Sequence, residues 1–336
     1  MVTIAEIAKR AGVSPSTVSK ALRGRDDINK ETASQILTYA VEMGYSTDTR
    51  ENNKKNCIGI LFPEVISDYY ARIVNSLISL FRDEEMETFL AISDFSGERE
   101  TLLFQQMLDM KLTAIICITE QDILSPRIRE STSLYNIPIL QIAMNQQSYG
   151  HDNICVDERV GLNLAVNHLV DLGHREIAFL GDPYGERRLF FFQEALRNRG
   201  LPDKNILLTK ARHWQAGYEL AGQLLSKKKW QGITAVIAEY DNIAVGAMRR
   251  FSEAGFLIPR DFSVIGFDDA KYCSFLPVAL TTVNSHAEEM CDIAFEMLYR
   301  KIRNPNYKVI QNSSIVPTLV FRESTAPPAV KKQGKA

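Results

Sequence analysis

Apolar and polar positions divide the chain into a short helical start and a longer region of mixed character. Near the N-terminus, apolar residues recur at helical spacing over residues 4–11, 15–22 and 29–43. Thr3 and Ser14 stand immediately before the first two segments, where a side-chain oxygen can cap the first turn of a helix. The pattern therefore predicts three short helices before the chain becomes polar.

Farther along, short apolar runs alternate with amphipathic segments. The runs that predict strands are Ile58–Phe62, Thr88–Ser93, Ala114–Thr119, Pro138–Ala143, Ile177–Gly181, Thr234–Ala238 and Ser263–Phe267. The segments that predict helices are Tyr69–Glu85, Arg99–Met110, Arg159–Leu172, Arg187–Arg199, Ala216–Lys228 and Asn242–Ala254. Such alternation is typical of parallel sheets with helices on both faces. Because roughly 270 residues exceed what one such sheet needs, we predict two α/β lobes.

Between these regions, residues 46–56 contain no apolar residue, a composition typical of a linker. We accordingly expect a helix-turn-helix headpiece in residues 1–46 and a short polar hinge in residues 47–56. A two-lobed domain should follow in residues 57–325, and a disordered tail in residues 326–336.

The composition is that of a globular protein, with 45% hydrophobic and 24% charged residues among 336. No uninterrupted apolar run approaches the ~18 residues of a membrane span, and the first residues lack the pattern of a signal peptide. We therefore expect a cytoplasmic protein. Its five cysteines lie far apart without CxxC spacing, which favours buried free thiols over a metal site.

Charge is distributed unevenly, with five basic residues and one acidic residue among the first 25. A basic end on a chain of net charge −2 suggests local contact with a polyanion. The predicted helices over 4–11 and 15–22, separated by Gly12-Val13-Ser14, also have the dimensions of a helix-turn-helix motif. The second helix of that motif enters the DNA major groove. The alternative is a small helical bundle with a solvated polar helix.

On the DNA-binding hypothesis, the start of the second helix faces the bases and nearby hydroxyl groups face phosphates, which position the protein without specifying sequence. The candidate base contacts are Pro15, Ser16 and Lys20. The candidate phosphate contacts are Thr3, Ser14, Thr17 and Ser19, and Arg23 completes the DNA-binding set.

The start of the chain, Thr3-Ile-Ala-Glu-Ile-Ala-Lys-Arg-Ala-Gly-Val-Ser-Pro-Ser-Thr-Val-Ser-Lys-Ala-Leu-Arg-Gly24, closely resembles the headpiece of LacI/GalR-family repressors. Later segments resemble that family in its order and extend the resemblance to about residue 325. They are Glu42-Met-Gly-Tyr45, Asp171-Leu-Gly-His-Arg-Glu-Ile-Ala-Phe-Leu-Gly181, Val264-Ile-Gly-Phe-Asp-Asp269, Leu280-Thr-Thr-Val283 and Arg322-Glu-Ser-Thr325.

The resemblance implies a DNA-binding transcriptional regulator, expected to be a repressor, that binds a pseudo-palindromic operator as a homodimer, with a tetramer left open. It also implies two lobes like those of periplasmic binding proteins, with an effector between them, often a sugar or nucleoside; we expect a sugar or sugar derivative. The first lobe should combine about 57–157 with about 285–315, and the second about 158–284 with about 316–325.

One segment departs from the family pattern. Members usually follow the Gly44-Tyr45 pair with a hinge helix whose leucine inserts into the minor groove. Residues 46–56 are wholly polar and shorter by roughly one helical turn. Because the segment offers no apolar wedge to kink a base step, we expect this protein to bend its operator less.

Two residues are candidates for effector contact because they follow predicted strands. Asp268 comes after the strand 264–267, and Arg188 begins a helix after the strand 177–181, so both should lie at the carboxyl ends of strands. A carboxylate and a guanidinium there can hydrogen-bond paired hydroxyls, and both match the family's effector-contacting positions. For Asp268 the alternative is a turn aspartate that caps the next segment.

Aromatic and polar residues at similar positions extend this set. Tyr69 and Tyr70 either stack on the ligand or pack the first lobe. Asp241 matches an aspartate that in relatives follows an asparagine, and Tyr240 replaces that asparagine, which suggests an altered ligand. The remaining effector-binding candidates are Asp94, Asn145 and Trp214, of which Trp214 is either a lid aromatic or part of the core.

Other classes of function fit less well. The headpiece and the lack of a signal peptide argue against a transport-type sugar-binding protein. No glycine-rich phosphate loop, Ser-His-Asp spacing or metal cluster supports an enzyme, and nothing in the sequence partners His168 or His174 for catalysis. We expect no catalytic residue, cofactor or metal. The alternative that stays open is a DNA-binding regulator whose lobes serve dimerisation or a protein coregulator.

Overall fold

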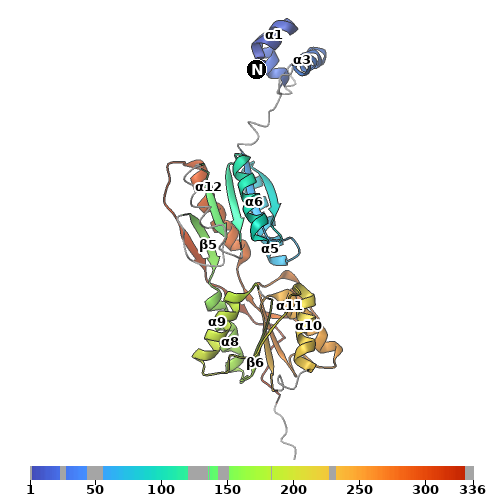
Figure 1. Cartoon of the computed structure of the whole chain (residues 1–336), viewed down its shortest axis with the longest axis vertical. Coiled ribbons are helices and arrows are strands. Elements are labelled where there is room, and N and C mark those ends of the chain that lie inside the picture. The colour runs from blue at the N-terminus through green and yellow to red at the C-terminus, as the bar shows by residue number, and fades with distance from the viewer. Residues whose placement is uncertain are drawn as a thin grey trace, which may run out of the picture. The chain divides into compact units, whose positions relative to one another are not determined.

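The computed structural model describes residues 2–22, 28–43, 56–119, 135, 137–142, 151–182, 184–226 and 232–329. The chain divides into two compact units, Met1–Lys55 and Asn56–Ala336, which are coloured along the chain in Figure 1. The predicted hinge and the residues Arg23 and Asn145 lie outside the described residues, except for Asn56. In the described part of the chain, no helix is both long and apolar enough to cross a membrane.

The first unit contains the three predicted helices, α1 (Ile4–Ala11), α2 (Pro15–Leu22) and α3 (Lys30–Glu42). Thr3 and Glu6 form the predicted capping box, because the Thr3 side chain accepts from the Glu6 N–H and the Glu6 carboxylate accepts from the Thr3 N–H. The Ser14 hydroxyl accepts from the N–H of Thr17 at 3.1 Å. The core consists of Ile7, Ala8, Val18, Ala21, Ile36 and Ala40.

The first lobe of the second unit is built on a six-stranded sheet in the order β11-β5-β4-β3-β1-β2. Every pair of neighbouring strands in it is parallel. The strands are β1 (Cys57–Phe62), β2 (Glu87–Ile92), β3 (Ala114–Ile118), β4 (Ile139–Ile142), β5 (Asp152–Val156) and β11 (Asn312–Ile315).

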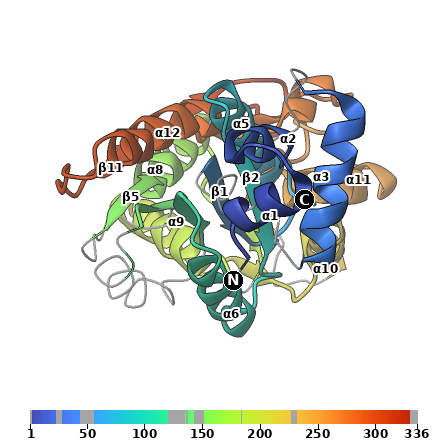
Figure 2. The same cartoon turned by 90° about the horizontal axis from the view of Figure 1, so that it is seen from above.

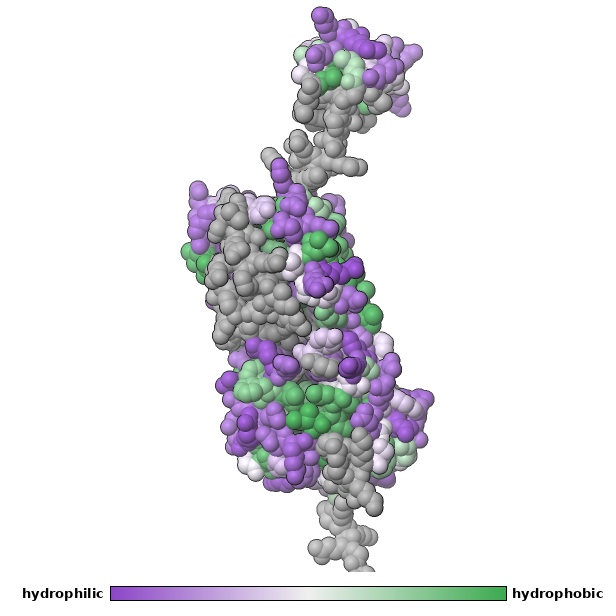
Figure 3. Space-filling view, in the orientation of Figure 1, coloured by the Kyte–Doolittle hydropathy of each residue, from purple (hydrophilic) through white to green (hydrophobic). Residues whose placement is uncertain are grey.

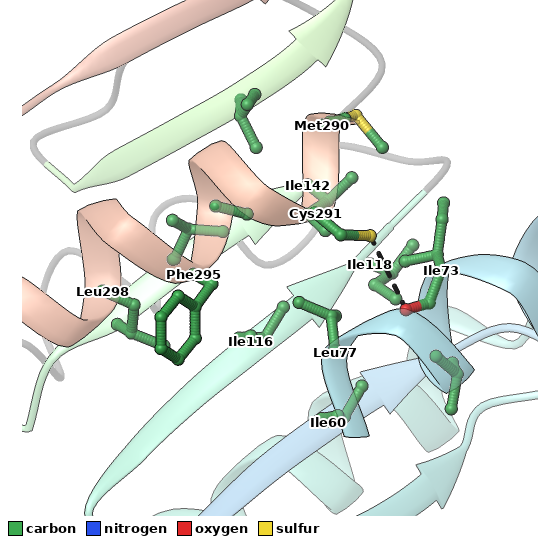
Figure 4. Packing of buried hydrophobic residues seen from close by; sticks show 14 of the residues in the cluster. Ile60, Ile73, Leu77, Ile116, Ile118, Ile142, Met290, Cys291, Phe295 and Leu298 are labelled. Atoms are coloured by element: carbon green, nitrogen blue, oxygen red, sulfur yellow. Dashed lines mark hydrogen bonds between the residues drawn. The ribbon is translucent and has the colours of Figure 1, made fainter. Parts of the chain in front are cut away.

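Helices cover both faces of this first sheet. Figure 2 shows α5 (Asp68–Asp83) and α12 (Ala287–Arg303) on one side of it and α6 (Gly97–Asp109) on the other. In Figure 4, Ile116 of β3 lies between Phe295 of α12 and Leu77 of α5, and all three are buried. The thiol of Cys291 donates to the carbonyl of Ile73 across the two helices, with Sγ and O 3.6 Å apart.

The second lobe has a six-stranded sheet in the order β12-β10-β9-β8-β6-β7, parallel except for the β10–β12 pair. Its strands are β6 (Ile177–Gly181), β7 (Ile206–Leu208), β8 (Ala235–Ala238), β9 (Ser263–Phe267), β10 (Thr281–Asn284) and β12 (Thr318–Val320). Figure 1 shows α8 (Glu158–Asp171) and α9 (Glu186–Asn198) on one face and α10 (His213–Ser226) and α11 (Asp241–Glu253) on the other.

The chain passes between the lobes three times, after β5, after β10 and after β11. The predicted fold class, a three-helix headpiece with two α/β lobes built on parallel sheets, is confirmed. The sequence pattern missed β5, β7, β10, β11, β12 and α12. At Ala326, the first residue of the predicted tail, the N–H donates to the Ser263 hydroxyl and the carbonyl accepts from Ser263 and His174; residues 330–336 lie outside the described residues.

Two glycines bring α10 and α11 into close contact. A Cβ atom on Gly217 would lie 1.9 Å from the carbonyl oxygen of Ile243, and one on Gly246 would lie 2.0 Å from that of Trp214. Backbone atoms of each helix therefore occupy the space that a side chain on the other would need, which fixes the two helices against each other.

We expect Gly246→Ala to lower the free energy of unfolding by about 1–3 kcal/mol, the usual cost of forcing extra volume into a packed core. Urea unfolding followed by circular dichroism measures it. Gly222→Ala is the matched control on α10, because its added Cβ would meet Arg250 at an ordinary 3.4 Å, and alanine favours a helix by about 1 kcal/mol over glycine. Equal losses in both variants would contradict the close-packing interpretation.

Candidate functional site

A cleft in the second unit is lined by residues of both lobes at the carboxyl ends of strands. Its lining comprises Glu64, Ser67, Tyr69, Tyr70, Tyr184, Gly185, Arg188, Arg212, Glu239, Tyr240 and Asp268. The free space inside is about 40 Å³, room for a few water molecules, since one needs roughly 10–15 Å³. The carboxyl edge of parallel sheets is where such folds bind ligands, so this cleft is the candidate ligand site.

Arg188 and Asp268, the two strongest sequence candidates, meet in this cleft. Arg188 lies in the first turn of α9, and its Nη2 is 3.2 Å from the Asp268 carboxylate. Its Nε donates to Glu158 at 2.6 Å and its Nη1 to the Glu239 carbonyl at 2.7 Å. Burial opposes the charge on Arg188, but the carboxylates of Asp268 and Glu158 outweigh it and raise its pKa well above the ordinary value.

Asp268 has a strained backbone and contacts both lobes. It follows β9 with φ of 97°, a conformation that non-glycine residues seldom adopt without support from their surroundings. The support comes from Arg72 on α5, whose Nη2 donates to the Asp268 carbonyl at 2.6 Å, across the lobes. Its side chain meets Arg188 of the second lobe. The predicted placement of Asp268 at the strand end therefore agrees with the structure.

Tyr69 and Tyr70, in the first turn of α5, both line the cleft, with ring centroids 5.3 Å apart in an edge-to-face arrangement. Burial, followed by the nearby Asp268 carboxylate, raises the pKa of the Tyr69 hydroxyl. Tyr70 is 6% exposed and belongs to the apolar core of the first lobe. The structure thus gives Tyr70 a packing role and also presents both rings to the cleft.

Asp241 lies outside the cleft lining. Its carboxylate is buried behind the cleft, where it accepts from the Thr282 hydroxyl at 2.6 Å and from the Ala270 N–H at 2.7 Å. Burial, and then repulsion from Asp268, raises the pKa of Asp241 to about 7. These contacts hold the loop after β9 in place, while its neighbour Tyr240 lines the cleft instead.

Two further candidates also lie apart from the cleft. Asp94 is exposed in the turn after β2, with φ of 54° and its N–H donating to the Pro63 carbonyl. Trp214 is 49% exposed in the first turn of α10, so it is not part of the core, and its carbonyl packs against Gly246. Asn145 lies outside the described residues.

Sequence reasoning missed several cleft residues, among them Glu64, Arg212 and Glu239. Glu64 contacts His213 of the other lobe, with Oε2 and Nε2 3.0 Å apart. The Arg212 guanidinium lies 3.5 Å from the centroid of the Phe95 ring, also across the lobes. Glu64 and Glu239 each follow a predicted strand closely, at β1 and β8, and that position was the available signal.

In the headpiece, the predicted base contacts lie on the surface of α2. Pro15, Ser16 and Lys20 are exposed, and hydrophilic residues cover much of the described headpiece surface in Figure 3. The predicted phosphate contacts are divided, because Thr3 and Ser14 are exposed whereas Thr17 and Ser19 are half-buried. The hydroxyl oxygens of Thr3 and Ser14 already accept hydrogen bonds from backbone N–H groups as helix caps. A contact with phosphate would therefore be additional to the capping role.

Two family models match the chain. Residues 3–48 match the bacterial regulatory proteins of the lacI family, and residues 166–325 match a periplasmic binding protein-like domain. The HTH-type transcriptional regulator DegA of Bacillus subtilis is 28% identical over 97% of this chain and 98% of its own length. AscG, an HTH-type transcriptional regulator of Escherichia coli, is 27% identical over 86% of this chain and 89% of its own length.

Solved structures share the fold. The lac repressor dimer bound to operator and an anti-inducer has a TM-score of 0.74 and 22% identity, and the match covers 97% of this chain and 99% of that one. The complex of the regulator CelR with cellobiose has a TM-score of 0.68 and 21% identity, and the match covers 96% of this chain and 100% of that one.

Proposed function

Because the chain belongs to the lacI family of bacterial regulatory proteins, and is thus a DNA-binding transcriptional regulator, we propose that it is a repressor. It binds a pseudo-palindromic operator as a homodimer. A sugar or sugar derivative bound between its lobes sets its affinity for that operator. The observation that carries this proposal is the Arg188–Asp268 pair, in a cleft lined from both lobes. A solved relative with cellobiose bound supports the ligand class.

The proposed mechanism is a shift between lobe arrangements. A ligand that contacts both lobes favours the arrangement it fits best, and the headpieces of the dimer respond to that choice. The coupling is reciprocal, so operator DNA changes ligand affinity by the same factor, about 5–150-fold in typical systems. Fluorescence anisotropy with operator fragments from flanking genes, repeated with a panel of sugars, tests the proposal. Salt-sensitive, sequence-indifferent binding to every fragment would refute it.

The second lobe carries a surface suited to a second copy of the chain. An apolar groove of about 310 Å³ lies between α11 and the loop after η3 (Lys271–Phe275), with Val245, Met248 and Leu257 in its lining. Phe275, next in sequence to the lining residue Leu276, is 86% exposed. Exposed apolar area of this kind marks protein contact surfaces, and we assign it to the proposed dimer.

We expect Phe275→Asp to convert the dimer to monomer, because a charge would be buried without a partner at the contact. Sedimentation velocity measures the change, and operator affinity should fall because the two half-sites are then bound independently. Phe321→Asp is the matched control, since Phe321 is 66% exposed but lies beyond β12, outside the groove. A Phe275 variant that sediments as wild type would exclude this surface.

A second candidate function keeps DNA binding but assigns the lobes to dimerisation or a protein coregulator. The narrow cleft, with about 40 Å³ of free space and direct contacts across it, is the observation in its favour. Calorimetry against the same sugar panel separates the two candidates, because only the main proposal requires heat of ligand binding that Arg188→Ala removes.

A further inference from the structure

The charge of the cleft narrows the chemistry of its ligand, if the proposed ligand-controlled function holds. Glu64, Glu239 and Asp268 line the cleft and are each buried to nine-tenths or more. Its two arginines contact further buried carboxylates, Glu158 and Asp182. Among the described residues that line the cleft or contact its arginines, five carboxylates therefore face two guanidinium groups. Arg187, at 3.5 Å from Glu158, offsets one of them from outside.

The hydrogen-bond donors of Arg188 are already committed to the protein, and Arg212 contacts Asp182, with Nε and Oδ2 3.8 Å apart. Nε and both terminal nitrogens of Arg188 donate to Glu158, to the Glu239 carbonyl and to Asp268. The Arg212 guanidinium is stacked over Phe95 at 3.5 Å. An anionic ligand that bound Arg188 would have to displace its partners and would leave Glu158 and Asp268 buried without a counter-charge, which is costly.

Glu64, in contrast, has a carboxylate oxygen that accepts no hydrogen bond from the described residues. Its Oε2 contacts His213, but its Oε1 has no hydrogen-bond partner among the described residues, although Glu64 is 7% exposed. A buried carboxylate oxygen is unfavourable unless a donor meets it. Glu64 belongs to the cleft lining, so a molecule bound in the cleft can supply the missing donor.

Aromatic rings complete a site suited to positive charge. Tyr69, Tyr70, Tyr184 and Tyr240 line the cleft, and Arg212 already lies 5.0 Å from the centroid of Tyr184. Ring faces attract cations electrostatically and also stack on the apolar face of a sugar ring. We infer that the small molecule bound between the lobes carries a protonated amine in addition to hydroxyl groups, as an amino sugar does.

Calorimetry on the full-length protein tests this inference with matched compounds at a pH where the amines are charged. The probes are glucosamine, galactosamine and mannosamine, each beside its parent sugar, its N-acetyl derivative and the corresponding uronic acid. At least one amine should bind about ten- to hundredfold more tightly than its parent sugar, the range of a charge-assisted hydrogen bond. N-acetylation removes the charge and should remove that advantage.

Glu64→Gln tests the residue directly, because the amide keeps the size and removes the charge. The variant should lose the preference for the amine over its parent sugar, while Glu296→Gln, an exposed carboxylate on α12, should keep it. Equal or tighter binding of a neutral or acidic sugar, or no binding of any amine, overturns the inference. Operator binding measured in the same samples decides separately whether the proposed function stands.

Discussion

Arg188→Ala should abolish the response to ligand and lower the free energy of unfolding of the second unit by about 3–5 kcal/mol. Arg188 is 8% exposed and holds the carboxylates of Glu158 and Asp268, which would be left buried without their partner. Urea unfolding gives the stability, and calorimetry gives ligand binding. Because the predicted DNA-contacting residues are in the other compact unit, operator binding should persist wherever the variant remains folded.

Two further variants separate the role of Arg188 from a general loss of folding. Arg187→Ala removes a 39% exposed arginine next in sequence and should cost under about 1 kcal/mol, as surface ion pairs do. Arg188→Lys keeps the positive charge but loses the planar guanidinium group that can form several hydrogen bonds at once. It should therefore reduce ligand binding more than it reduces the free energy of unfolding. A normal ligand response in Arg188→Ala would remove the cleft from the mechanism.

Lys20→Glu should weaken operator binding by about 5–150-fold per half-site, the equivalent of about 1–3 kcal/mol for each base contact. Lys20 is exposed on α2, next to the exposed Ser16 and Pro15. The dependence of affinity on salt should also become shallower by about one ionic contact per half-site. Fluorescence anisotropy over a salt series measures both effects.

The matched control for charge is Lys204→Glu, an exposed lysine of the second lobe. It changes the net charge of the protein by the same amount without altering α2, so it should leave operator affinity close to that of wild type. If the two variants lose affinity equally, Lys20 acts only through overall charge and not through contact with the bases.

The fold could be predicted from sequence wherever burial and periodicity coincide. The apolar strands β1, β3, β6, β8 and β9 and the amphipathic helices beside them stand within two or three residues of their predicted bounds. Strand β5 was missed because it begins with Asp152 and Asn153, which are buried in spite of their polarity. Lys301 of α12 pairs with Asp152 at 2.7 Å, a partner 149 residues away that no local pattern reveals.

The candidate site could be predicted only in part, for the same reason. Arg188 and Asp268 follow strands that the sequence shows clearly, and they do come together. Asp241 occupies an equivalent position, but its side chain turns toward Thr282 and Ala270, a direction set by the packing of β9 and β10. The contact between Glu64 and His213 depends on how two lobes meet, which lies beyond any pattern within one lobe.

The backbone contact between α10 and α11 joins two places that would otherwise act separately. Tyr240, immediately before α11, faces the cleft, and Val245 and Met248, one and two turns later, face the apolar groove. His213 at the start of α10 touches the first lobe. Because the backbones of α10 and α11 are in close contact, the two helices should move together. We therefore expect a molecule that displaces His213 or Tyr240 to move the residues of the groove as well. If the cleft binds the ligand and the groove forms the dimer contact as proposed, both functions depend on this one pair of helices, and any substitution that alters one function is constrained by the other.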